Sequence, residues 1–136
     1  MKQLWRAEDI SPLGLAFIGD AIWEIYARNH CLNAGVRKPR DLHVRCTRYV
    51  AAAAQAEALK MLESVLNEAE LEIVRRGRNQ KSAHVRRNVD VIVYRYSTGF
   101  EALIGYLHAT GQVARLQELA ALALAHLDEI ERRGSG

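Results

Sequence analysis

The sequence has few prolines and few cysteines. Pro12 and Pro39 are the only two prolines in 136 residues, so proline interrupts no helix after the first third of the chain. Cys31 and Cys46 form neither a CxxC pair nor a ligand cluster with histidines. This scarcity argues against a disulfide-stabilised secreted domain and against a zinc site, and it predicts two reduced thiols.

Long hydrophobic runs are also missing. No segment approaches the ~20 apolar residues that a membrane span needs, and the N-terminal sequence MKQLWRAEDI has no apolar signal core. The catalytic patterns GxSxG, P-loop and HExxH are absent as well. The sequence therefore predicts a cytoplasmic protein without a membrane segment, whose chemistry depends on some other arrangement of residues.

The chain is rich in alanine and leucine within a 49% hydrophobic composition. Both residues favour helix over strand, and no internal repeat, low-complexity tract or long linker divides the sequence. A length of 136 residues suits one domain with its own core. We therefore predict a single all-α domain over residues 1–136, with its core at about 11–132.

Local start and stop signals divide the chain into helices. Ser11 can cap the first helix and Gly35 can end it. Asn67 and Glu70 have the spacing of a capping box at the start of another helix. The expected helices span 12–33, 42–66, 68–76, 91–110 and 112–132, and the expected loop spans 77–89.

Two acidic residues lie in the most hydrophobic parts of the expected helices. Asp20 follows Gly19 in LAFIGDAIWE, and Glu101 lies between Gly99 and Gly105 in STGFEALIGYL. A buried carboxylate is costly unless a cation or several donors meet it, and a glycine beside it indicates close approach to the backbone. Two carboxylates that face each other from different helices would form a cradle for Mg²⁺.

Each acid also has a purely structural interpretation. Thr98 and Glu101 have the spacing of a capping box, so Glu101 could cap a helix that starts near Ser97. Asp20 could pair with an arginine inside the fold, or the helix could break after Gly19. The residues by themselves leave these alternatives open.

Charge is unevenly distributed along the chain, although the net charge is only +3. No acid occurs between Glu72 and Asp90, whereas this stretch holds several arginines and a lysine. A segment of one sign within a nearly balanced chain indicates a polyanionic partner. A solvated basic loop would give the same pattern.

Two segments resemble the signature helices of the ribonuclease III family. LAFIGDAIWE has an Asp after a hydrophobic–Gly step, and YRYSTGFEALIGYLH has an acid directly before Ala-Leu-Ile-Gly. KPRDLHVRCTRYVAAAAQAEAL and RRGRNQKS match the same family in order and spacing. The resemblance runs from about Gly14 to Gly111 and is closest to the Mini-ribonuclease III group, which has the catalytic domain but no double-stranded-RNA-binding domain.

This resemblance implies a ribonuclease III endonuclease-domain-like helical bundle that acts as a metal-dependent endoribonuclease. Asp20 and Glu101 would bind Mg²⁺, for which Mn²⁺ could substitute, and would be the catalytic residues. The expected enzyme is a homodimer that cuts double-stranded RNA to 5′-phosphate and 3′-hydroxyl ends, and its expected substrate is the precursor of large-subunit (23S) ribosomal RNA. The residues expected to contact RNA phosphates are Lys38, Arg40, Arg45, Arg48, Arg75, Arg76, Arg78 and Lys81.

The chain departs from longer ribonuclease III members at three positions that usually carry acids. These positions hold Leu13, Ala16 and Thr98. With only Asp20 and Glu101 left, water and RNA phosphate would supply most of the metal's six ligands. The missing acids suggest one alternative, a non-catalytic duplex-RNA-binding protein of the same fold. A second alternative is a helical protein-interaction module that uses the Ala51–Ala54 face and the Val113–Ile130 seam.

Overall fold

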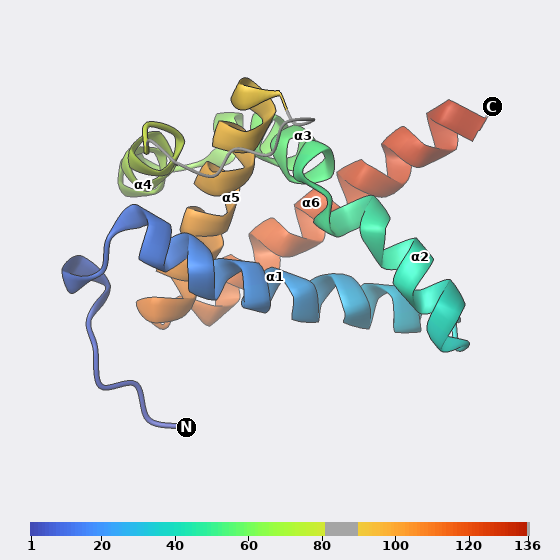
Figure 1. The fold of residues 1–136 in the computed structure, drawn as a ribbon, viewed down its shortest axis with the longest axis horizontal. Coiled ribbons are helices and arrows are strands. Elements are labelled where there is room, and N and C mark those ends of the chain that lie inside the picture. Colours follow the sequence, from blue (N-terminus) through green and yellow to red (C-terminus); the bar gives the residue numbers. More distant parts are fainter. Residues whose placement is uncertain (81–89, 136) are drawn as a thin grey trace.

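Helices form the regular structure of the described chain (Figure 1). A computed structural model describes residues 1–80 and 90–135, and no β-strand occurs within these ranges. The all-α expectation is therefore confirmed. The elements are η1 (Ala7–Asp9), α1 (Pro12–Asn33), α2 (Pro39–Val50), α3 (Ala52–Leu62), η2 (Glu63–Val65), α4 (Glu68–Arg78), α5 (Val91–Ala109) and α6 (Val113–Ser135).

Several of the predicted helix ends are confirmed by the structure. Ser11 Oγ accepts a hydrogen bond from the Gly14 N–H (3.1 Å) at the start of α1. Gly35 follows α1 with a φ of +93°, which residues with a side chain rarely adopt. At the start of α4, Asn67 and Glu70 exchange the two hydrogen bonds of a capping box.

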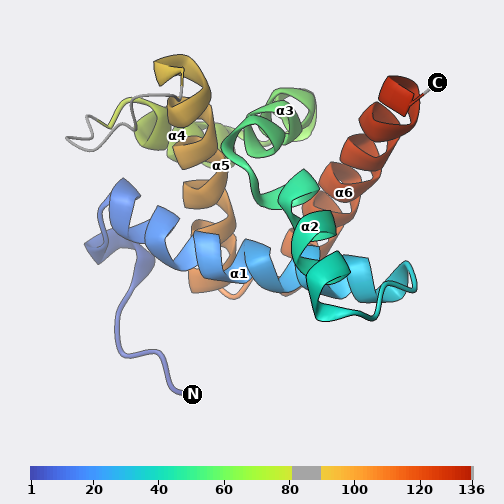
Figure 2. The same ribbon diagram turned by 45° about the vertical axis from the view of Figure 1, so that its right-hand side comes forward.

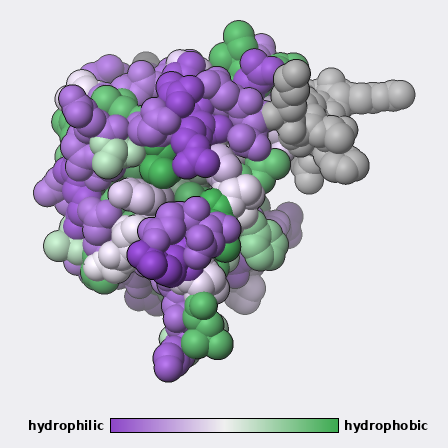
Figure 3. Space-filling view, turned by 90° about the vertical axis from the view of Figure 1, so that its left-hand side faces the viewer, coloured by the Kyte–Doolittle hydropathy of each residue, from purple (hydrophilic) through white to green (hydrophobic). Residues whose placement is uncertain are grey.

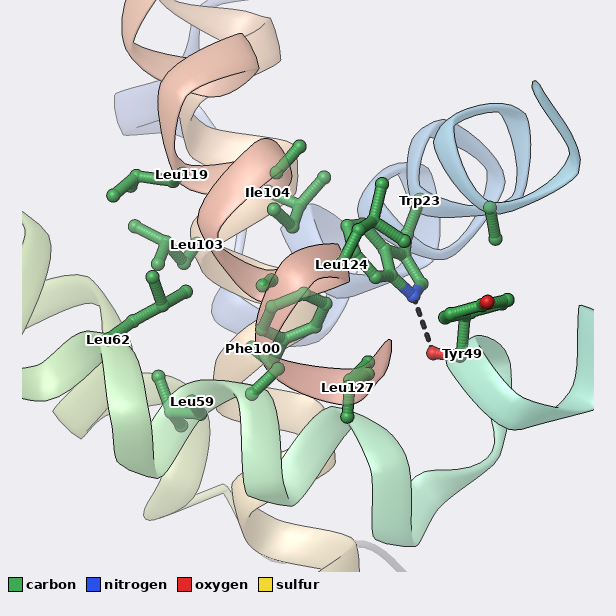
Figure 4. Close-up of a cluster of buried hydrophobic side chains, with 14 of the residues drawn as sticks. Trp23, Tyr49, Leu59, Leu62, Phe100, Leu103, Ile104, Leu119, Leu124 and Leu127 are labelled. Atoms are coloured by element: carbon green, nitrogen blue, oxygen red, sulfur yellow. Dashed lines mark hydrogen bonds between the residues drawn. The ribbon is translucent and has the colours of Figure 1, made fainter. Parts of the chain in front are cut away.

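The expected helix over 42–66 is wrong, because the chain turns between α2 and α3. Ala51 adopts an extended backbone there (φ −61°, ψ 148°). The indole N–H of Trp23 donates to the Tyr49 carbonyl at 2.8 Å (Figure 4), and a continuous helix would use that carbonyl for residue 53. The turn lets α2 lie against α1 while α3 packs on α5, so long-range packing decides this boundary.

The expected loop 77–89 begins later than predicted, because Gly77 and Arg78 belong to α4. A Cβ added to Gly77 would lie 3.0 Å from the Cα of Gly99 in α5. This glycine pair lets α4 and α5 pack closely. Residues 81–89 of the expected loop lie outside the described part of the chain.

The central helix is α5, and α1, α3, α4 and α6 pack around it (Figures 1 and 2). The core includes Trp23 and Phe100, whose rings meet edge to face with centroids 4.8 Å apart (Figure 4). Each fully buried large side chain contributes about 1.5–3 kcal/mol, so α5 is firmly held on several sides. Further buried members of this core are Leu59, Leu62, Leu103, Ile104, Leu107 and Leu119.

The surface is mainly hydrophilic on the face shown in Figure 3, where hydrophobic residues are scattered. Among the described residues, no helix is both long and apolar enough to cross a membrane. One regular apolar feature remains exposed along α1, with a spacing of four residues. This feature, which we name the α1 stripe, consists of Leu13, Phe17, Ala21 and Ile25.

Candidate active site

The backbones of α1 and α5 cross almost in contact, and glycine makes this possible. A Cβ added to Gly19 would lie 1.8 Å from the carbonyl oxygen of Glu101. A Cβ added to Gly105 would lie 1.9 Å from the carbonyl oxygen of Leu15. Both oxygens belong to the backbone, so they could not move aside as the end of a flexible side chain would. The glycines near the two acids therefore allow close approach of the helices, as the sequence indicated.

This crossing brings Asp20 of α1 and Glu101 of α5 together. Asp20 is exposed and Glu101 is half-buried, and their carboxyl groups are hydrogen-bond partners. Burial, together with the hydrogen bond and negative charge of Asp20, raises the pKa of Glu101 to about 8. The geometry thus agrees with the expectation that two carboxyl groups face each other from different helices.

Within the described part of the chain, neither acid has the purely structural role that the sequence also allowed. Asp90 caps the start of α5 by accepting a hydrogen bond from the Ile92 N–H (2.8 Å), so Glu101 lies in mid-helix and caps nothing. The α1 helix passes through Asp20 without a break. Within residues 1–80 and 90–135, neither Asp20 nor Glu101 forms a salt bridge with a lysine or arginine.

The acid pair has the chemistry of a hard-cation site with few protein ligands. Carboxylate oxygens are the ligands that Mg²⁺ prefers, and a divalent cation would balance two adjacent negative charges. In the described ranges, no group of three or more His, Cys, Asp or Glu side chains could hold a metal. Thr98 donates its hydroxyl to the Tyr94 carbonyl of its own helix (3.1 Å), and Ala16 is buried. The residues present therefore fit a cation held by two carboxylates and completed by water and phosphate.

One polar neighbour of the acid pair is not evident from the sequence. Gln55 of α3 is 1% exposed and accepts a hydrogen bond from the Ser97 hydroxyl (2.5 Å). It is also a hydrogen-bond partner of the Glu101 carboxyl, and this contact lowers the Glu101 pKa. A single amide within AAAAQAEAL is the sequence signal, and that signal does not show which helix the amide faces.

Glu24, one turn after Asp20, belongs to a different contact. Its carboxylate lies 3.3 Å from Nε of Arg28 and 4.0 Å from Sγ of Cys46. Glu24 therefore lies at the contact between α1 and α2, paired with a cation.

The exposed candidates for RNA contact lie in two separate places. Lys38 and Arg40 are exposed at the start of α2. This helix begins shortly after the end of α1, and the end of α1 lies about 20 Å along the α1 axis from Asp20. Arg76 is exposed near the end of α4, and α4 packs directly on α5. Lys81 lies outside the described residues. Contact of these residues with RNA stays a prediction.

Two candidates on α2 already interact within the fold. Arg45 is half-buried, and the Tyr49 side chain beside it raises its pKa. Arg48 lies 3.6 Å from the carboxylate of Glu131 in α6. Both guanidinium groups therefore have contacts within the chain, which makes them less available to RNA than Lys38.

Two candidates on α4 are also engaged. Arg75 forms a surface ion pair with Glu72 (2.6 Å). Arg78 is half-buried, and its guanidinium lies 4.1 Å from the ring centroid of Tyr96 in α5. Arg76 is thus the candidate on this helix without such a contact among the described residues.

Comparison with known sequences relates this geometry to a family. The sequence profile of the Ribonuclease III domain matches residues 13–112, which include both acids. Mini-ribonuclease 3 of Streptococcus pneumoniae is 46% identical over 121 residues, covering 88% of this chain and 94% of that protein. Mini-ribonuclease 3 of Brevibacillus brevis is 47% identical over 125 residues, covering 91% and 93% respectively.

A solved structure shares the fold of this chain. A crystal structure of a Fusobacterium nucleatum protein matches with a TM-score of 0.77 and 30% identity, covering 87% of this chain and 94% of that one. The shared fold thus extends over nearly the whole of both chains. Taken with the family profile and the close relatives, it shows that the chain belongs to the ribonuclease III family, within the Mini-ribonuclease III group, and is an endoribonuclease.

Proposed function

We propose that this chain cuts double-stranded RNA in a reaction that depends on Mg²⁺ held by Asp20 and Glu101. Members of the ribonuclease III family act on double-stranded RNA and generally use divalent metal ions. The observation that carries the proposal is the carboxyl pair at the α1–α5 crossing, where Asp20 lies beside a Glu101 of raised pKa. Mg²⁺ takes hard oxygen ligands and keeps several waters, and Mn²⁺ is expected to substitute for it.

The two side chains contribute position and charge to phosphodiester hydrolysis. A bound divalent cation supplies positive charge that promotes ionisation of the attacking water and offsets charge on the phosphate. Asp20 is exposed and accessible to a phosphate, whereas Glu101 is anchored on the central helix. Departure of the 3′-oxygen, which takes up a proton, leaves a 3′-hydroxyl end and a 5′-phosphate end.

Two copies of the chain are expected to pair through the α1 stripe. Phe17 is 83% exposed and Ile25 is 64% exposed, and a partner would remove this apolar surface from water. Asp20 lies between them on the same helix. Pairing would therefore bring the two acid pairs to one shared surface, where each subunit cuts one strand of the duplex.

The proposed natural substrate is the precursor of large-subunit (23S) ribosomal RNA, in the cytoplasm. The similarity to Mini-ribonuclease 3 proteins supports this proposal, as do the exposed cations Lys38, Arg40 and Arg76. Duplex RNA is recognised mainly through its shape and backbone, which such cations can contact.

The two alternatives from the sequence have less support. The family assignment is to endoribonucleases, which disagrees with a non-catalytic RNA-binding protein. The seam proposed for a protein-interaction module is mostly core, although Val113 and Ile130 at its ends are exposed. Its buried residues are Leu116, Ala120, Ala123 and Leu127.

The proposal is tested by incubating purified protein with a labelled RNA duplex in Mg²⁺ or in EDTA. We expect cleavage that requires Mg²⁺ and is lost in Asp20→Asn and Glu101→Gln, while both variants still bind the duplex in EDTA. Glu24→Gln is the matched control on the same helix and should cleave like the wild type. Undiminished cleavage by Asp20→Asn would eliminate the proposed site.

The substrate needs a separate measurement. Mapping the 23S precursor ends in cells that lack the protein should show unprocessed ends, and Asp20→Asn should fail to restore them. Normal ends in those cells would exclude the precursor as the required substrate.

A further inference from the structure

We propose that Gln55 is a positioning residue that holds the Glu101 carboxyl in place for the metal; this inference rests on the proposed metal site. Gln55 is polar, yet only 1% of it is exposed. A buried polar side chain is costly unless its groups are satisfied. Its carbonyl end meets Ser97 of α5, and its side chain also hydrogen-bonds with Glu101, one turn further along the same helix.

The contact with Ser97 fixes the orientation of the Gln55 amide. The Ser97 hydroxyl donates to Oε1 of Gln55 at 2.5 Å, so the carbonyl end of the amide is occupied. The Nε2 group can only donate and is left for the Glu101 carboxyl. Ser97 and Glu101 are four residues apart on one face of α5, so a single flat amide reaches both.

A neutral donor suits a carboxylate that has to bind a cation. A lysine or arginine at this position would balance the charge of Glu101 and compete with the metal, whereas an amide donates a hydrogen bond and leaves the charge available. Groups that hydrogen-bond to ligating carboxylates orient them for the metal. Gln55 therefore restrains the Glu101 side chain at little cost to its negative charge.

The turn between α2 and α3 puts the amide in place. Gln55 lies in the first turn of α3, and its N–H bonds to the Ala51 carbonyl (3.0 Å). Because Ala51 is extended, α3 leaves the direction of α2 and packs along α5. The same turn that departs from the sequence prediction thus positions the site.

Gln55→Met tests this inference, because methionine has a similar length but no donor. We expect the Mg²⁺ concentration for half-maximal cleavage to rise about 10-fold, while the KM for a labelled RNA duplex and the thermal midpoint stay near wild type. Ser97→Ala, which removes only the group that orients the amide, should shift the Mg²⁺ requirement in the same direction by less. Wild-type Mg²⁺ dependence in both variants would overturn the proposal.

Metal binding without RNA provides a second test that does not depend on activity. Mn²⁺ affinity is measured by electron paramagnetic resonance for wild type, Gln55→Met, Glu101→Gln and the double variant. If Gln55 acts through Glu101, Gln55→Met weakens Mn²⁺ binding when it is introduced into the wild-type protein. It has no further effect when it is introduced into the Glu101→Gln variant. An equal loss in both backgrounds would overturn the positioning role. Wild-type Mn²⁺ binding by Glu101→Gln would instead overturn the metal site itself.

Discussion

At the scale of single residues, the candidate site depends on the absence of two Cβ atoms. Gly19 and Gly105 let the backbones of α1 and α5 meet, and this contact sets the distance between Asp20 and Glu101. Glycine in mid-helix costs up to about 1 kcal/mol relative to alanine. Glycine is nevertheless required at both positions, because any side chain there would push α1 and α5 apart.

Gly19→Ala should therefore destabilise the protein. The added Cβ would lie 1.8 Å from a backbone oxygen, so the helices must shift, at a cost of about 2 kcal/mol or more. Urea unfolding measures the change, and RNA cleavage should fall with it because the acids move apart. Gly134→Ala is the control in α6, where nothing lies within 4 Å, and it should stabilise slightly. Equal stability of the two variants would contradict the tight crossing.

Glu101 should make the metal-free protein less stable as the pH rises. Burial and Asp20 raise the pKa of Glu101 to about 8 in the folded state, whereas the unfolded carboxyl ionises near 4.5. Between these values the folded state binds more protons, so the free energy of unfolding decreases with rising pH and levels off above about 8.

Glu101→Gln should remove this loss of stability. In EDTA at pH 9 we expect the variant to be more stable than the wild type by roughly 2–4 kcal/mol, with little difference at pH 4. Asp20→Asn, which removes the neighbouring charge, should give a smaller gain. Thermal unfolding across this pH range is the measurement, and a parallel pH dependence of variant and wild type would contradict the raised pKa.

At the scale of elements, the contact between α4 and α6 depends on one carboxylate. Glu70 is 1% exposed and completes the capping box of α4. Its carboxylate also accepts two hydrogen bonds from the Arg115 guanidinium of α6, at 2.9 and 2.8 Å. A local cap in the sequence thus becomes a link between distant helices once the chain folds.

Glu70→Ala should destabilise the protein by about 3 kcal/mol, because it removes the cap and leaves Arg115 without its main partner. The Arg115 hydrogen bonds hold the pKa of Glu70 below its usual value. This stabilisation is therefore fully present above a pH of about 4.5, the pKa of the Glu70 carboxyl in the unfolded chain. It is lost as the pH falls through the lower pKa that Glu70 has in the folded protein. Chemical denaturation at pH 7 and pH 3 checks both statements.

The matched control for this prediction is Glu72→Ala, two residues along the same helix. Glu72 is exposed and pairs only with Arg75 among the described residues, and surface pairs of this kind contribute little. If Glu72→Ala lowered the stability as much as Glu70→Ala, the buried link would not be the cause.

At the scale of the whole molecule, the α1 stripe is the feature that a second copy would cover. Phe17→Ser should convert the expected dimer to a monomer, because Phe17 is 83% exposed and contributes little to the core of one chain. Multi-angle light scattering measures the mass, and thermal unfolding of the monomer should show an intact fold. Val44→Ser, at a side chain 63% exposed on α2, is the control and should remain dimeric. A monomeric wild type would contradict the pairing.

Much of the architecture could be predicted from the sequence, because its signals are local. Ser11, Gly35 and the Asn67–Glu70 box mark helix ends through contacts within a few residues. The two acids could be singled out because each lies in an apolar helix beside glycine. Such signals depend on backbone geometry and burial cost, which a short stretch of sequence already contains.

Other features were decided only by tertiary structure. The turn at Ala51 carries no proline or glycine, and Trp23, far away in sequence, takes the carbonyl that would have continued the helix. The same holds for Gln55, whose place beside Glu101 follows from that turn. The sequence by itself determined which residues could form helices and an acid pair. The directions of these helices were decided only by the packing of α1, α3 and α5. A backbone carbonyl that accepts its hydrogen bond from a distant side chain leaves no signal in the local sequence.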